Sequence, residues 1–368
     1  MLPGFSDSTF EREAFDELLT EAMQANASDV HITVALPPIM RVNGKLVPMR
    51  EVALGPQDTE KFCRWILNEK QQATLDEKGE VDFSYGIPNV SRFRVNIYRQ
   101  RKSMTAAIRI INTSIPTLES LGFPTIMQEL AVKPRGLILV TGPTGSGKST
   151  TLAAMVNFIN QNHDRHILTL EEPIEYLHKH QKSMVNQREI GDDSLSFANG
   201  LRAALREDPD VILVGEMRDL ETISTAVSAA ETGHLVLSTL HTTNAPQTID
   251  RIIDVFPPYQ QTQIRVQLAS VLQGIIAQQL LITSDGKDRV AALEILVGTD
   301  AVRNTIREGK IHQVNSYIQT GQKYGMMSMD YSLAQLVRKS RISTETALSY
   351  CHDSDMLQRY LVSEASLF

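Results

Sequence analysis

The segment TGPTGSGKST, residues 141–150, carries the spacing GxxxxGK(S/T) between an apolar run, GLILVTG, and a helical stretch, STTLAAMVNFINQ. This strand, loop and helix order is the context in which the spacing binds phosphate. Glycines let the backbone turn tightly and aim N–H groups at β- and γ-phosphate oxygens, Lys148 adds a positive charge, and Ser149 is expected to ligate Mg²⁺. The sequence predicts a site for ATP or GTP made of Gly142, Thr144, Gly145, Ser146, Gly147, Lys148, Ser149 and Thr150.

Hydrolysis also needs a carboxylate that orients and deprotonates water near the γ-phosphate. Glu216, in DVILVGE, follows a predicted buried strand and is the candidate general base, because such strand ends face the phosphates in a P-loop sheet. Glu171 and Glu172 end another predicted strand in LTLEEPIEY, where Pro173 prevents a central strand from continuing. With Glu175 they are candidates for organising Mg²⁺ or water. The alternatives are a solvated acidic loop and an ordinary surface glutamate at 216.

Two histidines flank the apolar run in GHLVLSTLHTTNA, residues 233–245. His234 and His241 are seven positions apart, so on a regular strand they point to opposite faces and do not chelate one ion. Four further histidines at positions 163, 166, 178 and 180 have no neighbouring cysteine or helical HExxH pattern, which disfavours zinc. We expect His241 to hydrogen-bond the γ-phosphate or the attacking water. His234 is either a second nucleotide sensor or a core histidine.

Four arginines are candidates for contacting phosphate. Arg94 in RFRVN and Arg109 in AIRII lie on neighbouring predicted strands far from the glycine-rich loop in sequence. They can stabilise phosphoryl charge only if their part of the chain meets a nucleotide pocket, possibly that of another copy. Half-exposed strand arginines are the alternative. Arg202 and Arg206, in LRAALREDPD, are four apart and are expected on one helical face.

The elements that position these residues divide the chain. Residues 1–112 alternate short strand patterns after one helical stretch and predict an α+β domain, followed by a linker at 113–124 that contains Pro116 and Pro124. Residues 125–298 alternate continuous apolar runs with helical segments, the pattern of an α/β fold with a parallel sheet. Residues 299–368 read as a C-terminal helical subdomain, with Ser328 and either Ser343 or Thr344 as helix caps.

Composition restricts the classes of function. The 368 residues carry a formal net charge of −7, so the chain as a whole offers no electrostatic surface for wrapping nucleic acid. Its two cysteines, Cys63 and Cys351, form no CxxC pair and suit a reducing compartment. The sequence has neither a signal-peptide pattern nor an apolar run of about 18 residues. We expect a cytoplasmic protein that reaches a membrane only through partners.

Taken together, the ordered motifs resemble those of the PilT-type retraction ATPases of type IV pili, within the secretion ATPase superfamily. The resemblance rests on ASDVHI, GPTGSGKSTT, EPIEY, LREDPDVILVGEMRD, ETGHLVLSTLHTTNA and IREGK, and covers roughly residues 15–355. It implies an N-terminal PAS-like domain, a RecA-like P-loop core and a hexameric ring.

The resemblance also implies residue roles. Residues 142–150 match the family's Walker A segment, 170–176 its aspartate box, 205–219 its Walker B segment and 233–245 its histidine box. Glu216 is then the catalytic glutamate, and His234 and His241 are nucleotide sensors. The four arginines fall where the superfamily carries arginines that serve the nucleotide site. IREGK, residues 306–310, resembles a C-terminal motif linked to activity beyond hydrolysis. The aspartate box departs from the family: Glu172 stands where aspartate is usual, which changes the reach of that carboxylate.

This reading predicts a hexameric motor that uses Mg-ATP hydrolysis to remove pilin subunits from a pilus in twitching motility. Its partners would be the other subunits, an inner-membrane platform protein and, indirectly, the pilin machinery, with no nucleic acid and no direct membrane insertion. Alternatives are an accessory retraction ATPase, or a pilus-assembly or type II secretion ATPase. From other classes, the alternatives are a nucleotide-binding recruitment module without turnover and a small-molecule P-loop kinase.

Overall fold

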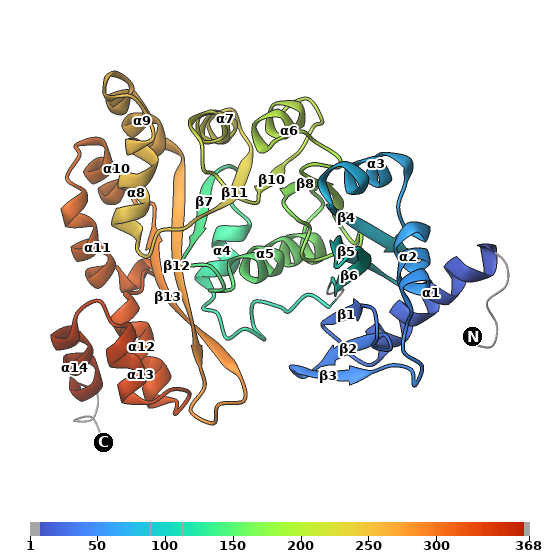
Figure 1. Cartoon of the computed structure of the whole chain (residues 1–368). Helices are drawn as coiled ribbons and strands as arrows, with labels where there is room; N and C mark the ends of the chain where they lie inside the picture. Colours follow the sequence, from blue (N-terminus) through green and yellow to red (C-terminus); the bar gives the residue numbers. More distant parts are fainter. Residues whose placement is uncertain (1–7, 89, 112–113, 364–368) are drawn as a thin grey trace. The chain divides into compact units, whose positions relative to one another are not determined.

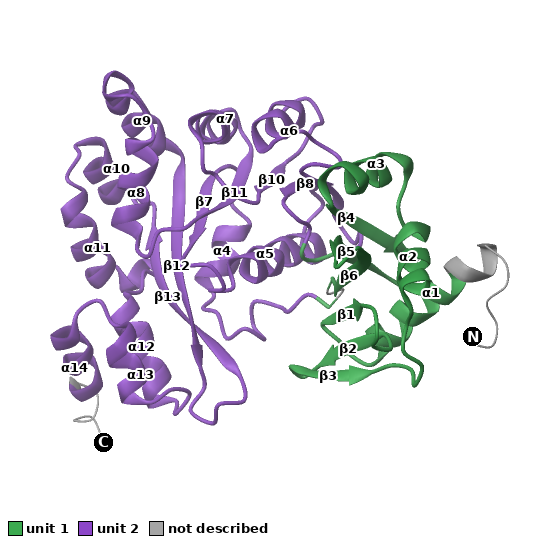
Figure 2. Ribbon diagram, in the orientation of Figure 1, with its two compact units in different colours: residues 1–114, 175–177 green, residues 115–174, 178–368 purple. Residues whose placement is uncertain are grey.

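The structure is a computed structural model that describes residues 8–88, 90–111 and 114–363. The chain forms two compact units (Figure 2): unit 1 comprises residues 1–114 and 175–177, and unit 2 comprises residues 115–174 and 178–368. The domain boundaries predicted from sequence stay predictions. Among the helices in the described ranges, none is both long and apolar enough to cross a membrane.

Unit 1 is a six-stranded antiparallel sheet with the order β3-β2-β1-β6-β5-β4. Its strands are β1 (Asp29–Ile32), β2 (Ile39–Val42), β3 (Lys45–Pro48), β4 (Glu80–Ile87), β5 (Ser91–Gln100) and β6 (Ser103–Ile110). Its helices are α1 (Ser8–Gln24), α2 (Pro56–Trp65) and α3 (Glu69–Lys78). The short turn between β2 and β3 is Asn43–Gly44, with φ of 49° and 79°, the geometry that favours this dipeptide in a hairpin.

Strand periodicity divides the two faces of this sheet. On β5, Phe93, Val95 and Ile97 are fully buried in one core with side chains of the three helices, such as Phe15. Because side chains alternate along a strand, Arg94 lies on the opposite face and is exposed. The sequence did not lead us to expect α2 and α3.

Unit 2 contains a seven-stranded sheet with the order β13-β12-β7-β11-β10-β8-β9 (Figure 1), in which only β13 runs antiparallel to its neighbour. The strands are β7 (Gly136–Thr141), β8 (His166–Glu171), β9 (Met184–Glu189), β10 (Val211–Val214), β11 (Leu235–Leu240), β12 (Leu272–Ile282) and β13 (Arg289–Val297). Strands β9 and β12 were not anticipated from the sequence. The parallel arrangement explains the continuous apolar runs, because helices cover both faces.

Alternate residues of β7 enter two different cores. Leu137 and Leu139 pack in a core with side chains from helices α6 to α11, whereas Ile138 and Val140 pack in a second core with side chains from α4 and α5. These helices are α4 (Ile126–Ala131), α5 (Lys148–Asn162), α6 (Phe197–Ala204), α7 (Leu220–Glu231), α8 (Ala245–Asp254), α9 (Pro258–Val271), α10 (Asp300–Arg307) and α11 (Val314–Thr320), with short 3₁₀ turns at Ile311–Gln313 and Gln322–Tyr324. Unit 2 is therefore a three-layer α/β structure.

The far ends of β12 and β13 extend to a third core with helices α12 (Met329–Arg338), α13 (Thr344–Tyr350) and α14 (Ser354–Ser363). Ser328 and Ser343 cap α12 and α13 by accepting the backbone N–H of Tyr331 and of Thr346. Ser343, rather than Thr344, is the cap of α13.

The buried position of Leu139 makes a test of this packing. Leu139 is 0 % exposed, so L139A should lower the free energy of unfolding by about 2–5 kcal/mol through lost contacts and a cavity. Leu195 is 87 % exposed, and the matched L195A variant should change it by less than about 0.5 kcal/mol. Urea denaturation followed by far-UV circular dichroism measures both. Equal shifts in the two variants would contradict the assigned layers.

Candidate functional site

One edge of the sheet in unit 2 collects the predicted site residues. Strand β7 ends at Thr141, which is paired with Leu240 at the end of β11, and β10 ends one position before Gly215. The glycine-rich loop, Glu216 and His241 therefore all follow the carboxyl ends of parallel strands. In open α/β sheets such an edge is where ligands bind.

The loop between β7 and α5 lies directly against β12. Gly142 has a φ of 146°, and a Cβ atom there would come within 2.3 Å of the backbone oxygen of Gln278. The Gln278 side chain is 2 % exposed; its Nε2 donates to the Ser146 carbonyl at 2.7 Å, and its Oε1 accepts from the Thr151 hydroxyl at 2.6 Å. Gln278 thus joins the loop to the helix that follows it.

Sequence reasoning missed Gln278, although a signal was present. The run VLQGIIAQQLLI, residues 271–282, reads as a buried strand in which a polar pair, Gln278–Gln279, interrupts the apolar side chains. A polar side chain in a buried strand requires hydrogen-bond partners, and those partners lie in the loop.

Lys148 begins α5 and is 9 % exposed. Its Nζ atom donates to the carbonyl oxygens of Gly142 at 2.8 Å and Pro143 at 3.0 Å. The ammonium group thereby closes the loop on itself. Ser149 and Thr144 are exposed, whereas the Ser146 hydroxyl oxygen is buried and finds no hydrogen-bond partner among the described residues.

Glu216 is held by its neighbours in the chain. Gly215 donates its N–H to the Leu170 carbonyl of β8 at 2.7 Å, and its own carbonyl accepts the Thr239 hydroxyl of β11 at 2.6 Å. The Met217 N–H donates to the Thr239 carbonyl at 3.2 Å. Because the residues on both sides are bonded to adjacent strands, the direction of the Glu216 side chain is defined by the sheet.

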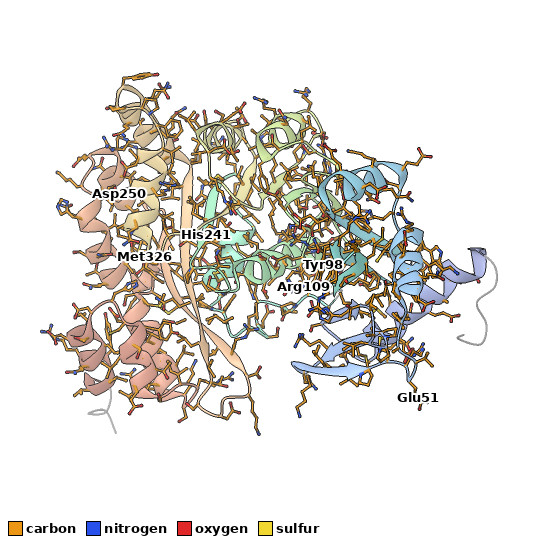
Figure 3. The ribbon with its side chains drawn as sticks, viewed as in Figure 1. Glu51, Tyr98, Arg109, His241, Asp250 and Met326 are labelled. Carbon is orange, nitrogen blue, oxygen red and sulfur yellow. The ribbon has the colours of Figure 1, made fainter. Side chains whose placement is uncertain are left out.

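The Glu216 carboxylate lies between two basic side chains. It forms an ion pair with Arg218, and its Oε2 atom lies 3.6 Å from Nε2 of His241. Burial, followed by the charges of Lys148 and Arg218, lowers the pKa of His241 below its usual 6.5. His241, labelled in Figure 3, is therefore neutral at physiological pH and can donate or accept a hydrogen bond.

The acidic residues after β8 have different surroundings. Oε1 of Glu171 accepts the Thr169 hydroxyl at 2.6 Å and Nε2 of Gln187 at 3.0 Å, so this carboxylate is bound to β8 and β9. Glu172 is exposed. Glu175 belongs to unit 1, so it is not part of the group of side chains in unit 2.

The interpretation of His234 as a nucleotide sensor stays a prediction, but the structure places it at the other end of β11 from His241. His234 precedes β11, and its carbonyl accepts the N–H of Gly136 at the start of β7, whereas His241 follows the end of β11. At the usual rise of a strand the two histidines are roughly 20 Å apart. Nδ1 of His234 lies 3.0 Å from the Ala229 carbonyl, which gives this side chain a structural role between α7 and β11.

Arg94 and Arg109 lie on unit 1, directly opposite each other on paired strands β5 and β6. Both are exposed; Arg109 is labelled in Figure 3. Nε of Arg109 donates to Oδ1 of Asp29 on β1 at 3.0 Å. The prediction of neighbouring strands is confirmed, and their roles as arginines of a nucleotide site stay predictions.

Arg202 and Arg206 do not share one helix. Helix α6 ends at Ala204, so Arg206 lies beyond it and donates to the Arg202 carbonyl at 3.2 Å. Arg202 pairs with Glu221 of α7. The expectation of one helical face is therefore wrong, because the helix ends before it reaches Arg206. A nucleotide contact for either residue stays a prediction.

The IREGK segment closes α10. Glu308 and Lys310 form an ion pair at 2.7 Å, and Gly309 between them has a φ of 73°. A Cβ atom at Gly309 would lie 3.7 Å from the guanidinium of Arg265 on α9. The segment is thus part of the contact between α9 and α10.

Comparison with known proteins covers almost the whole chain. Residues 6–365 match the family described as type II/IV secretion system protein. The chain is 49% identical over 340 residues to a twitching motility protein of Neisseria gonorrhoeae, covering 92% of this chain and 91% of that protein. It is 49% identical over 331 residues to the type IV pilus retraction ATPase PilT of Pseudomonas aeruginosa, covering 90% and 96%.

The fold is similar to a crystal structure of the pilus retraction motor PilT with bound ADP. The TM-score is 0.86 at 49% sequence identity, covering 93% of this chain and 98% of that one. The resemblance inferred from the motifs is confirmed, and so is the expected α/β fold class, a RecA-like core with an N-terminal domain and C-terminal helices. The chain belongs to the family of type II/IV secretion system proteins.

Proposed function

We propose that this protein is an ATP-hydrolysing motor that drives type IV pilus retraction in twitching motility. One observation carries the proposal. A chain that is 49% identical to a pilus retraction ATPase over 90% of its length brings a glycine-rich loop, Glu216 and His241 to one edge of its sheet.

In the proposed mechanism the loop binds the phosphates of ATP. Its backbone N–H groups and the N-terminus of α5 supply positive potential, to which Lys148 adds a full charge. The Lys148 ammonium now donates to two loop carbonyls, and binding a triphosphate replaces at least one of these with a phosphate oxygen. The buried Ser146 hydroxyl offers a further donor, since it has no partner among the described side chains and backbone groups.

Glu216 acts as the general base in this proposal. A carboxylate near the γ-phosphate orients water and accepts its proton, an effect typically worth about 10²- to 10⁴-fold in rate. Its ion pair with Arg218 orients the carboxylate, and the neutral imidazole of His241 beside it can donate a hydrogen bond to water or phosphate. Glu171 and Glu172 are further acidic residues, proposed to organise Mg²⁺ or water. Glu171 is oriented by β8 and β9, and Glu172 is solvent-exposed.

The Ser149 hydroxyl suits Mg²⁺, because this ion prefers oxygen ligands and is usually held by few protein groups together with phosphate. Ser149 follows Lys148 in the first turn of α5, is exposed, and carries a hydroxyl oxygen. Within the described residues no three His, Cys, Asp or Glu side chains form a metal site of their own. Mg²⁺ would be held by Ser149 with phosphate oxygens, and would neutralise phosphate charge. Glu175 remains only a candidate.

Arg94 and Arg109 are the reason for proposing that the motor is an oligomer. Arg94 and Arg109 are exposed on unit 1, and an arginine supplied to the transferring phosphoryl group can raise the rate by about 10³- to 10⁵-fold. We infer that subunits of a hexamer complete each other's sites, so that closure of the domains on ATP produces motion. The motor would act at the cytoplasmic face of the inner membrane, bound to a membrane platform protein of the pilus and only indirectly to pilin.

Two substitutions separate binding from turnover. K148A should abolish nucleotide binding, because the loop loses its only full charge, whereas E216Q should bind ATP but lose turnover by about 10²- to 10⁴-fold. Equilibrium binding of a fluorescent ATP analogue and phosphate release measure the two steps. E345Q, at an exposed position in α13, is the isosteric control and should match the parent protein. Normal turnover by E216Q would overturn the assignment of the base.

Deletion of the gene distinguishes retraction from assembly. A cell without the retraction motor should keep, or gain, surface pili and lose twitching motility. The parent gene should restore twitching motility and the parental number of surface pili, whereas the K148A variant should restore neither. Loss of surface pili in the deletion strain would instead indicate an assembly or secretion ATPase.

If neighbouring subunits complete each other's nucleotide sites, the ATPase rate depends on assembly of the hexamer. ATPase rate per subunit should rise with protein concentration as the mass by light scattering approaches that of a hexamer, because a monomer lacks the arginines of a neighbour. The R94A and R109A variants should still assemble into rings, but these rings should hydrolyse ATP more slowly than those of the parent protein. A monomer that hydrolyses ATP at the full rate would rule out a contribution in trans.

A further inference from the structure

We propose that Glu294 is a positioning residue for hydrolysis: it fixes the end of the loop that carries His241 and couples that loop to His352 in the C-terminal helices. The proposal rests on the proposed ATPase function. It concerns unit 2 alone, and every contact in it lies between described residues.

Glu294 lies in the middle of β13, where it pairs with Ala277 of β12, and it is 3 % exposed. Its Oε1 atom accepts the N–H of Ala245 at 2.8 Å, a fully buried hydrogen bond. Ala245 is the first residue of α8. A carboxylate at the first N–H of a helix interacts favourably with the helix dipole and satisfies a donor that has no partner within the helix.

The same bond fixes the His241 loop. Only residues 241–244 connect β11 to α8, so the loop is bound at one end to the sheet and at the other to Glu294. The hydroxyl of Thr242 in this loop lies 2.7 Å from that of Thr248 in α8, which is a further contact between the loop and the helix. His241 is the first residue of this loop and faces Glu216 at 3.6 Å. Release of Ala245 would therefore change the position of His241 relative to Glu216.

The second oxygen of Glu294 faces the C-terminal helices. Nδ1 of His352 lies 3.5 Å from Oε2, between α13 and α14. The backbone N–H groups of His352 and Asp353 both donate to Oδ1 of Asp330 on α12, at 2.7 and 3.3 Å. A continuous set of polar contacts, buried at Glu294 and Ala245 and partly exposed at His352, thus connects α12 and the segment before α14 to the amino end of α8.

The charges around His352 are mostly negative. Glu294 faces it from β13, Asp330 from α12 and Asp353 from its own segment, and the thiol of Cys351 precedes it in the chain. The hydrogen bond to Glu294, against the effect of burial, raises the pKa of His352 above 6.5. Glu294, Asp330, His352 and Asp353 also line a cavity of about 230 Å³.

The sign of the pH effect follows from this. A histidine with a raised pKa stabilises the folded state fully below about 6.5, and this stabilisation is lost as the pH rises through the folded value. In the charged form His352 holds Glu294 in place. In the neutral form this pair weakens, and the Glu294 carboxylate is then held only by its hydrogen bond to the Ala245 N–H. Turnover should therefore carry an inflection at the pKa of His352.

Three variants of the full chain test the proposal. E294A removes the oxygen that accepts the Ala245 N–H. It should lower kcat by about tenfold or more, because small misplacements near a reacting group are costly. The affinity for ADP should change by less than about threefold. E294Q keeps an oxygen for Ala245, so kcat should fall by less than about threefold while the inflection of kcat with pH disappears. H352N should also lose the inflection. S332A is the control. It removes the hydroxyl of α12 that accepts the N–H of Leu293, the neighbour of Glu294 on β13, and the inflection should remain.

The other variants still test the proposal if E294A fails to fold. If the parent protein, E294Q and H352N share one pH profile, or if S332A changes it as E294Q does, the proposal is wrong. A second readout is independent of turnover. In histidine-labelled NMR spectra, the His241 signal should shift as His352 titrates in the parent protein and not in E294Q. If this shift occurs without any ATP hydrolysis, the proposed function fails and the coupling stands. If hydrolysis occurs without the shift, the coupling fails alone.

Discussion

A loop that binds phosphate through backbone N–H groups cannot use the same groups to stabilise its own conformation. Other atoms must therefore hold it, and the structure provides two sets. Lys148 binds the carbonyls at the start of the loop, and Gln278 binds the carbonyl of Ser146 at its other end. Each of these contacts uses a loop carbonyl and therefore occupies none of the loop's N–H groups. The position of β12 beside β7 follows from the same requirement, because Gln278 must come from the neighbouring strand.

The order of the strands then determines what else reaches the loop. Strand β11 lies between β7 and β10, so His241 follows the strand next to the loop and Glu216 follows the one beyond it. The bonds of Gly215 to Leu170 and Thr239 fix Glu216 to the strands on either side. A carboxylate held in this way needs little reorganisation during a reaction, which is the condition for efficient electrostatic catalysis.

The sequence predicted best those features that are local. The spacing from Gly142 to Ser149 identified the loop, and the apolar runs identified β7, β8, β10 and β11, because a buried parallel strand leaves a continuous apolar signal. It failed where the fold brings distant residues together. Gln278 is more than 120 positions from its partners in the loop, as the bonds to Ser146 and Thr151 show. His234 was grouped with His241 because both match the histidine box of the family, and the structure places them at opposite ends of β11.

His241 and His352 illustrate how a fold separates two side chains of one type. Lys148 and Arg218 add to the effect of burial on His241 and favour its neutral form, so protonation costs stability as the pH falls below about 6.5. Glu294 outweighs burial at His352 and favours its charged form, so the stabilisation is lost at higher pH. Glu294 touches both regions, His352 directly and the His241 loop through Ala245. A buried carboxylate is stable only where such partners satisfy both of its oxygens. The C-terminal helices that hold His352 therefore contribute to the same polar network as the loop that faces Glu216.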